Sequence, residues 1–164
     1  GNAKMSKSLG NCIYLKDSPE EIKRKVFSMY TDPNHIKIED PGKVEGNVVF
    51  TYLDTFCKED SFSKYLPEYK DLDELKEHYR KGGLGDMKIK RFLNDILQEE
   101  LKPIRERREE LAKNPEYVYN VLKEGTIKAR EKASETLKEV KEAMGINYFA
   151  DSSFLEEVKE KYSN

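Results

Sequence analysis

The sequence predicts an all-α fold, and three observations support this prediction. Apolar residues recur every three to four positions along two long segments, from Ile89 to Leu111 and from Val118 to Met144, as on one face of a helix. Helix start and stop signals such as Ser18-Pro19 and Gly82-Gly83 bracket the shorter segments. Strand-like alternation is almost absent. Several amphipathic helices with short connections indicate a compact helical bundle.

The first sixteen residues are expected to be a loop followed by a short extended run over 12–15. That run is either the last strand of a neighbouring α/β domain or a connector. A helix is then expected to begin at Ser18, which can cap it, with Pro19 at the first position and Glu21 closing a capping box. Its apolar face would consist of Ile22, Val26, Met29 and Tyr30.

The middle of the chain predicts an irregular segment and two shorter helices. Pro33 and Pro41-Gly42 bracket the irregular segment. A second helix is expected over 48–57, where the aromatic content indicates burial. A third is expected over 72–80, ended by Gly82-Gly83.

The two long periodic segments predict two long helices. The first follows Gly85-Asp86, and Pro103 should kink it because proline removes one backbone hydrogen bond. The second opens at Pro115 and stops at Gly145, and Gly125 either interrupts it or is tolerated within it. A last short helix is expected over 153–161. The apolar stripes comprise Ile89, Leu93, Ile96, Leu97, Leu101, Ile104 and Leu111 in the first, and Val118, Leu122, Ala129, Ala133, Leu137, Val140 and Met144 in the second.

Composition limits the class of function. Charged residues make up 38% of the 164 residues and hydrophobic residues 37%, with a formal net charge of −2. A nucleic-acid contact would therefore need a local basic patch. No apolar run has membrane-spanning length, and there is no signal-peptide pattern. Cys12 and Cys57 match neither a metal-binding spacing nor a disulfide framework, so both are interpreted as thiols of a reducing compartment.

The string Lys4-Met5-Ser6-Lys7-Ser8, followed by Gly10, is typical of a phosphate-handling loop. Lysines three apart on a mobile loop can converge on one polyphosphate, while hydroxyl and backbone N–H groups fill other oxygen positions. Taken alone, the string fits a solvated Lys/Ser loop better than a binding loop.

Further segments give the chain a resemblance to the bacterial-type tryptophanyl-tRNA synthetase family, in the family's order. The family's His-Ile-Gly-His-like string is absent from the sequence. The matching segments are Lys4 to Asn11, Met29 to Pro33, Asn47 to Phe50 with Tyr52 to Asp54, Gly85-Asp86 with Lys88, Pro103 to Arg108, Gly125-Thr126 with Ala129-Arg130 and Ala133, and Ala143 to Gly145.

The resemblance implies a ligase that activates tryptophan with ATP and Mg²⁺ and charges its tRNA. Lys7 would stabilise the leaving pyrophosphate, with Lys4 in support. Ser6 and Ser8 would contact phosphate oxygens or brace the loop. Met5 would lie near the adenine, and Gly10 would be a hinge for closure on ATP.

The resemblance also implies a domain organisation. Residues 1–16 would be the KMSKS loop and the remnant of a Rossmann-like catalytic domain, and residues 17–164 a helical anticodon-binding domain. Because the loop stands first, we expect this chain to be a C-terminal piece that is inactive alone. The parent is expected to be a cytoplasmic homodimer without membrane contact, and the piece a monomer.

Two basic clusters are candidates for tRNA binding. Arg105 and Arg108 share a helix face, whereas Arg107 points elsewhere; the interleaved Glu106, Glu109 and Glu110 also fit a solvated ion-paired face. The second cluster is Lys88, Lys90 and Arg91.

The remaining polar and aromatic residues are given structural roles. Asp32 is interpreted as a turn residue, Asp86 as a helix cap, and His35 and His78 as surface residues without a metal. No pair of carboxylates stands out as an acid/base couple. The aromatic residues interpreted as core are Tyr30, Phe50, Tyr52 and Phe56.

Two alternatives remain open. The chain could belong to the related tyrosyl enzyme or to another class I synthetase, because the amino-acid pocket that separates them is not in this sequence. It could instead be a non-enzymatic helical interaction module whose basic N-terminal loop arose by chance.

Overall fold

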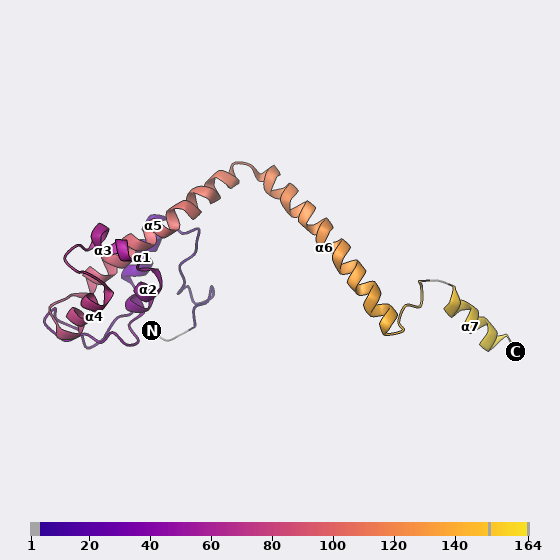
Figure 1. Cartoon of the computed structure of the whole chain (residues 1–164), viewed down its shortest axis with the longest axis horizontal. Helices are drawn as coiled ribbons and strands as arrows, with labels where there is room; N and C mark the ends of the chain where they lie inside the picture. The colour runs from indigo at the N-terminus through magenta and orange to yellow at the C-terminus, as the bar shows by residue number, and fades with distance from the viewer. Residues whose placement is uncertain (1–3, 151, 164) are drawn as a thin grey trace. The chain divides into compact units, whose positions relative to one another are not determined.

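The structure is a computed structural model that describes residues 4–150 and 152–163. Within those residues it contains helices and no strand, which confirms the all-α prediction (Figure 1). The chain forms two compact units, Gly1–Glu110 and Leu111–Asn164, whereas the division expected after residue 16 stays a prediction. The helices are α1 (Pro19–Phe27), α2 (Val48–Phe56), α3 (Glu59–Tyr65), α4 (Leu72–Lys81), α5 (Asp86–Ala112), α6 (Pro115–Ala143) and α7 (Ser153–Tyr162).

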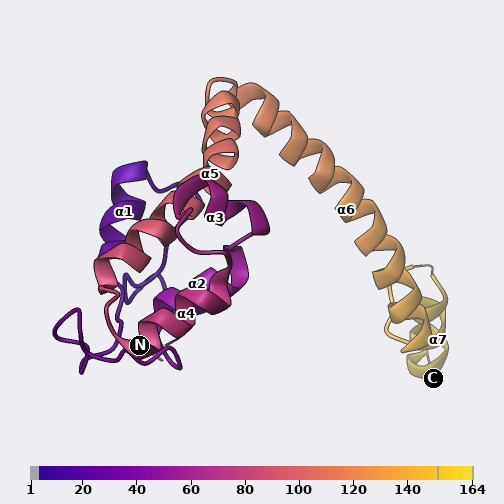
Figure 2. The ribbon, with the colours of Figure 1, turned by 60° about the vertical axis from the view of Figure 1, so that its left-hand side comes forward.

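The core of the first unit is shared by α1 to α5, which gather around one apolar cluster (Figure 2). Burying a side chain of this size stabilises the fold by roughly 1.5–3 kcal/mol. Among the described residues, every helix is too short or too polar to cross a membrane. The largest fully buried side chains include Tyr79, Phe50, Phe92, Ile22, Leu53, Leu75 and Leu93.

Helix α1 begins as its sequence predicts. The Glu21 backbone N–H donates to Ser18 Oγ at 3.2 Å, and the Ser18 N–H donates to Glu21 Oε2 at 3.0 Å. The helix ends at Phe27, so Tyr30 lies beyond it and is 48% exposed. Its predicted place in the apolar face is therefore wrong. The run over 12–15 forms no strand in the structure and serves as a connector.

Helices α2 and α4 match the predicted ranges to within one residue, whereas α3 was not expected. Gly82 and Gly83 end α4 with φ angles of 86° and 98°. A Cβ on Gly82 would lie 2.2 Å from the carbonyl oxygen of Glu39, so both the backbone angle and the space require glycine there.

Helix α5 carries the predicted stripe for only part of its length. The stripe is buried from Ile89 to Leu101, but Ile104 is 42% exposed. The helix continues through Pro103 to Ala112, and the expected kink at Pro103 stays a prediction.

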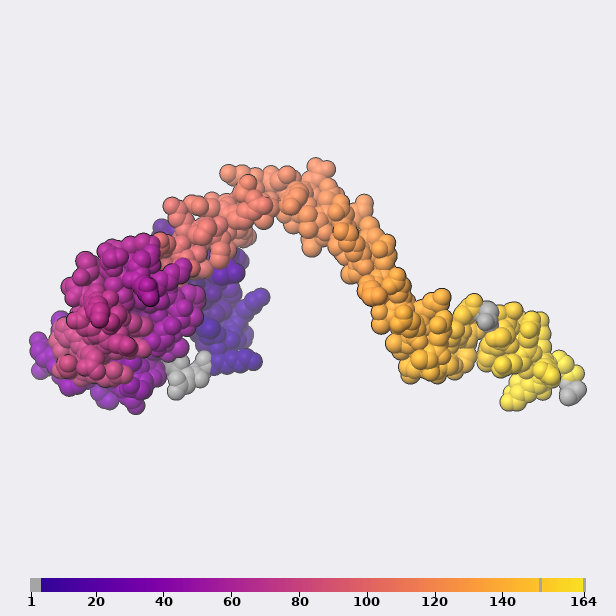
Figure 3. Space-filling model, in the orientation of Figure 1, coloured from indigo at the N-terminus to yellow at the C-terminus, as the bar shows by residue number. Residues whose placement is uncertain are grey.

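Helix α6 runs without interruption through Gly125, which settles the alternative left open at that residue. Gly145, with a φ of 67°, follows its end. Helix α6 is the orange stretch of the surface in Figure 3. None of its side chains is buried, and Leu122 is 65% exposed. The expectation that this stripe would be buried in a bundle is wrong. Helix α7 confirms the last predicted helix.

Candidate nucleotide-binding loop

The KMSKS string forms a tight turn held by its own polar groups. The Gly10 N–H donates to the Lys7 carbonyl at 3.2 Å, and Gly10 has a φ of 62°. The Leu9 N–H donates to Ser6 Oγ at 3.2 Å, while Ser6 Oγ and Ser8 Oγ lie 3.1 Å apart. The two hydroxyls thus shape the turn, which was one of their two expected roles.

Asn11 braces the same loop, a role that the sequence did not reveal. Its Oδ1 accepts from the Ser6 N–H at 2.9 Å, and its Nδ2 donates to the Lys4 carbonyl at 3.4 Å. The side chain therefore spans the loop from Lys4 to Ser6. These bonds reach back five and seven residues, so no local turn signal in the sequence predicts them.

Lys4 and Lys7 extend from this braced turn. Both are exposed, and neither has a carboxylate partner among the residues that the structure describes. Their ammonium groups are thus available to an anionic ligand such as a polyphosphate.

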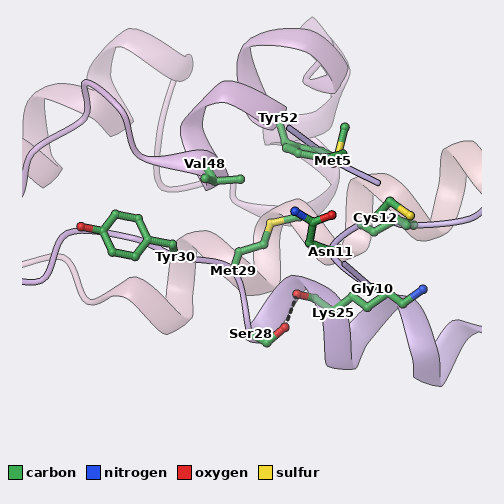
Figure 4. A pocket seen from close by; sticks show the side chains of 11 residues that line it. Met5, Gly10, Asn11, Cys12, Lys25, Ser28, Met29, Tyr30, Val48 and Tyr52 are labelled. Carbon is green, nitrogen blue, oxygen red and sulfur yellow. Dashed lines mark hydrogen bonds between the residues drawn. The ribbon is translucent and has the colours of Figure 1, made fainter. Parts of the chain in front are cut away.

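A cavity of about 270 Å³ lies beside the loop and is lined mainly by apolar atoms (Figure 4). Met5 and Tyr52 stand on the same side of it, and the Tyr52 hydroxyl donates to Met5 Sδ at 3.3 Å. Tyr52 lines this cavity and is also partly buried against the apolar core, as was expected of it. The other lining residues are Gly10, Asn11, Cys12, Ile13, Lys25, Ser28, Met29, Tyr30 and Val48.

Lys25 lies at the edge of this cavity but is held within the protein. Its Nζ donates to Asp17 Oδ2 at 2.5 Å and lies 4.5 Å from the centre of the Tyr14 ring. Burial raises the pKa of Asp17, but hydrogen bonds from Lys25 and from the Tyr14 N–H outweigh it and hold that pKa below its ordinary value. The charge of Lys25 is therefore balanced before any ligand arrives.

Asp86 is the centre of a partly buried polar network, and its predicted role as a helix cap is wrong. It is the first residue of α5, and its carboxylate accepts from Tyr79 at 2.7 Å, from Thr31 at 2.5 Å and from His35 Nδ1 at 2.9 Å. The His35 side chain is 3% exposed, so the surface role predicted for it is also wrong. The Asn47 Nδ2 donates to the Tyr79 hydroxyl at 3.3 Å. This network fixes the irregular segment 31–47 to α4 and α5.

Some of the other predicted structural roles are confirmed, and others are wrong. Asp32 is a turn residue as predicted, since it accepts from the Asn34 N–H at 2.9 Å. Phe50 is in the core, whereas Phe56 is 36% exposed. His78 is half-buried, with Nδ1 2.7 Å from the Tyr69 hydroxyl, so it is not a free surface residue. The described residues contain no group of three His, Cys, Asp or Glu side chains placed to hold a metal.

The second basic cluster is largely engaged inside the protein. Lys88 pairs with Glu68 at 2.8 Å. Lys90 is 8% exposed, and its ammonium donates to the Phe27 carbonyl at 3.1 Å. Burial lowers the pKa of Lys90 from its ordinary value. Arg91 alone of the three is exposed without a carboxylate partner among the described residues.

In the arginine cluster of α5, Arg107 lies apart from Arg105 and Arg108, as the helical spacing predicts. Arg107 pairs with Glu110 at 2.5 Å, away from the other two. Arg105 and Arg108 line one groove together with Lys16 from the connector. The sequence did not associate Lys16 with these arginines, because the groove is formed by segments about ninety residues apart.

Comparisons with known proteins all match this chain to one family of enzymes. The family model described as tRNA synthetases class I (W and Y) matches residues 1–102. The tryptophan–tRNA ligase of Clostridium longisporum is 62% identical over 149 residues, covering 91% of this chain and 41% of the relative. That of Lactococcus lactis subsp. lactis is 60% identical over 149 residues, covering 91% of this chain and 42% of the relative. The chain thus spans about two fifths of the length of these relatives.

Solved structures give the same result. A crystal structure of tryptophanyl-tRNA synthetase from Campylobacter jejuni matches with a TM-score of 0.66 and 31% identity, over 87% of this chain and 42% of that one. A second structure of the same protein, complexed with ADP and tryptophan, matches with the same score and identity and is covered to 41%.

Proposed function

The chain belongs to the class I tRNA synthetase family for tryptophan and tyrosine, and we propose from that membership that it is the KMSKS-loop part of a tryptophan–tRNA ligase. The observation that carries the proposal is the pair of exposed lysines, Lys4 and Lys7, on a turn braced by Ser6 and Asn11. Identity of 60–62% to tryptophan–tRNA ligases supports tryptophan over tyrosine as the amino acid.

The proposed chemistry uses the charges of the loop. The tryptophan carboxylate attacks the α-phosphorus of ATP, the bond to the bridging oxygen breaks, and pyrophosphate leaves with the negative charge. Lys7 would meet that growing charge, with Lys4 in support, and a cation placed there lowers the barrier more than it tightens ground-state binding. The substrate is ATP with its Mg²⁺, so the loop itself need supply only cations and N–H groups.

The cavity beside the loop fits the nucleoside part of ATP. Met5 lines it and offers a polarisable apolar surface to a base. The Tyr52 hydroxyl, which donates to Met5 Sδ, would set the position of that methionine. The ADP and tryptophan found with the Campylobacter jejuni synthetase support a nucleotide and tryptophan as ligands of this family member.

The helical body would bind the tryptophan tRNA, which supplies the third substrate. The exposed Arg91 and Arg108 and the half-exposed Arg105 are the proposed contacts, with Lys88 beside them, whereas the guanidinium of Arg107 is paired with Glu110. Lys90 was also a candidate, but its ammonium is used inside the protein. The complete ligase would act as a homodimer in the cytoplasm, and the 164-residue chain as a monomer.

A chimera tests the proposal. This chain would replace the matching 149-residue region of the Clostridium longisporum ligase, and tryptophan-dependent exchange of pyrophosphate into ATP and tRNA charging would be measured. We expect both activities in the chimera and neither in the chain alone. A folded chimera that catalyses neither reaction would overturn the assignment and favour the helical interaction module.

A further inference from the structure

A basic groove lies where the connector before α1 meets the C-terminal half of α5. Its volume is about 440 Å³. Four cationic side chains and two acidic ones line it, so it carries an excess of positive charge although the whole chain is slightly acidic. The charged residues are Lys16, Lys102, Arg105 and Arg108, against Glu106 and Glu109.

The cations of this groove are poorly neutralised by the protein. The carboxylate next to Lys16, that of Asp17, is buried and turned to Lys25. Lys16 and Arg108 form no ion pair among the described residues, and Lys102 approaches Glu106 only to 3.8 Å. The charge is therefore available to a ligand.

Arg105 is held in place by a built contact. Gln98 donates through Nε2 to the Pro19 carbonyl at 2.9 Å and accepts through Oε1 from Arg105 Nη2 at 3.1 Å. The amide thus ties the start of α1 to the guanidinium. The other terminal nitrogen, Arg105 Nη1, is buried and lacks a hydrogen-bond partner. A buried donor without an acceptor is unfavourable, so the guanidinium would gain a hydrogen bond by turning Nη1 toward an anionic oxygen in the groove.

We propose that this groove binds the phosphate backbone of tRNA, with Lys16, Arg105 and Arg108 as contacts and Gln98 as a positioning residue. The inference rests on the proposed function for the identity of the RNA. Arg105 and Arg108 lie three residues apart, or about 4.5 Å along the helix axis. A row of singly charged phosphodiesters matches such a row of cations in an open groove better than one compact anion does.

The groove also links tRNA binding to the position of the ATP loop. Lys16 stands six residues after Gly10, at the end of the connector that carries the KMSKS loop. A phosphate held between Lys16 and Arg105 would fix that connector against α5. Binding of tRNA to the helical body would therefore restrain the base of the ATP loop.

The test titrates the 164-residue chain with a fluorescent anticodon stem–loop of a tryptophan tRNA at several salt concentrations. Lys16→Gln, Arg105→Gln and Arg108→Gln should each weaken binding roughly tenfold. Each should also reduce the slope of log affinity against log salt by about one. Arg107→Gln is the matched control, because it removes the same charge from the same helix but outside the groove, and it should leave the slope unchanged.

The Gln98→Met variant tests whether Gln98 positions the Arg105 guanidinium. It keeps the side-chain size and the net charge but removes the hydrogen bonds to Pro19, Asn94 and Arg105, so affinity should fall without a change in salt slope. A lowered melting temperature with unchanged affinity would overturn the role of Gln98 as a positioning residue.

The other outcomes separate the two proposals. Equal effects of Arg107→Gln and the three groove variants, or no binding by the unaltered chain, would overturn the groove. Neither of these outcomes would affect the ligase assignment, which the chimera tests separately. Inorganic phosphate is the second probe. If it binds with the variant dependence expected for RNA while the stem–loop does not bind, the groove is a small-anion site and the RNA proposal fails.

Discussion

The Tyr79 hydroxyl donates a hydrogen bond to Asp86 Oδ1 at 2.7 Å, and this contact joins the end of α4 to the start of α5. The Asp86 carboxylate also accepts from Thr31 and His35, so one side chain anchors three segments of the first unit. Two of these segments, 29–33 and 85–86, are among those that carry the family resemblance.

Asp86→Asn should lower the free energy of unfolding by about 1–3 kcal/mol. The amide keeps one acceptor oxygen but loses the charge, and its NH₂ cannot accept the hydrogen bond that Thr31 or Tyr79 donates. Urea unfolding followed by circular dichroism measures the change. Asp73→Asn, on the exposed first turn of α4, is the control. A loss no larger than that of Asp73→Asn would contradict the anchoring role.

Stability should also fall in acid because of the same carboxylate. Burial raises the pKa of Asp86, but hydrogen bonds from Thr31, Tyr79 and His35 outweigh it and hold the pKa below the ordinary value. A depressed carboxyl pKa contributes stability above the unfolded-state pKa of about 3.9, and that stability is lost as the pH falls through the folded-state value.

Urea unfolding of the parent chain and of Asp86→Asn between about pH 6 and pH 3 tests this dependence. The parent should lose more stability than the variant over the acidic part of that range. Parallel curves would show that Asp86 does not supply the pH dependence.

Lys7→Ala, made in the chimera, should lower the maximal rate of tryptophan-dependent pyrophosphate exchange by about two to three orders of magnitude. The Michaelis constant for tryptophan should change little, because Lys7 would act on the leaving pyrophosphate and not on the amino acid. Lys23→Ala, on the exposed surface of α1, is the control. An unchanged maximal rate would remove Lys7 from the mechanism.

Gly125→Ala should stabilise α6 by about 1 kcal/mol. The glycine lies inside the helix, and a Cβ there meets nothing within 4 Å. Gly145→Ala is the matched comparison, since its φ of 67° penalises a side chain and predicts the opposite sign. Helicity and thermal melting of the two variants measure the difference. A decrease in helicity for Gly125→Ala would show a close contact at that position.

The sequence predicted helices wherever capping signals and periodicity agreed. Ser18 and Glu21 formed the expected capping box, and Gly82-Gly83 ended α4. Helix α3 was missed because its seven residues carry too few apolar positions for a period to show. Periodicity alone also could not tell that the stripe of α6 would be exposed, because spacing indicates a face and not its partner.

Some residues of the candidate site could likewise be found from the sequence, and others could not. The KMSKS residues could be found because they are consecutive, whereas the groove and the Asp86 network could not. Lys16 and Arg105 are far apart in the chain, and His35 and Asp86 are separated by 51 residues. Isolated polar residues at such separations look like ordinary surface or capping residues until the fold brings them together.

Helix α6 has 29 residues and no buried side chain, so its amides depend on local hydrogen bonds alone. A helix whose side chains are not buried opens and closes from its ends and around weak points, of which Gly125 is one. The backbone of α6 should therefore exchange with solvent by local opening, whereas the Ile89 to Leu101 stretch of α5 must wait for the whole first unit to unfold. Helices α5 and α6 are thus similar in length, but amide exchange in α6 is limited by local opening and exchange in the buried part of α5 by unfolding of the first unit.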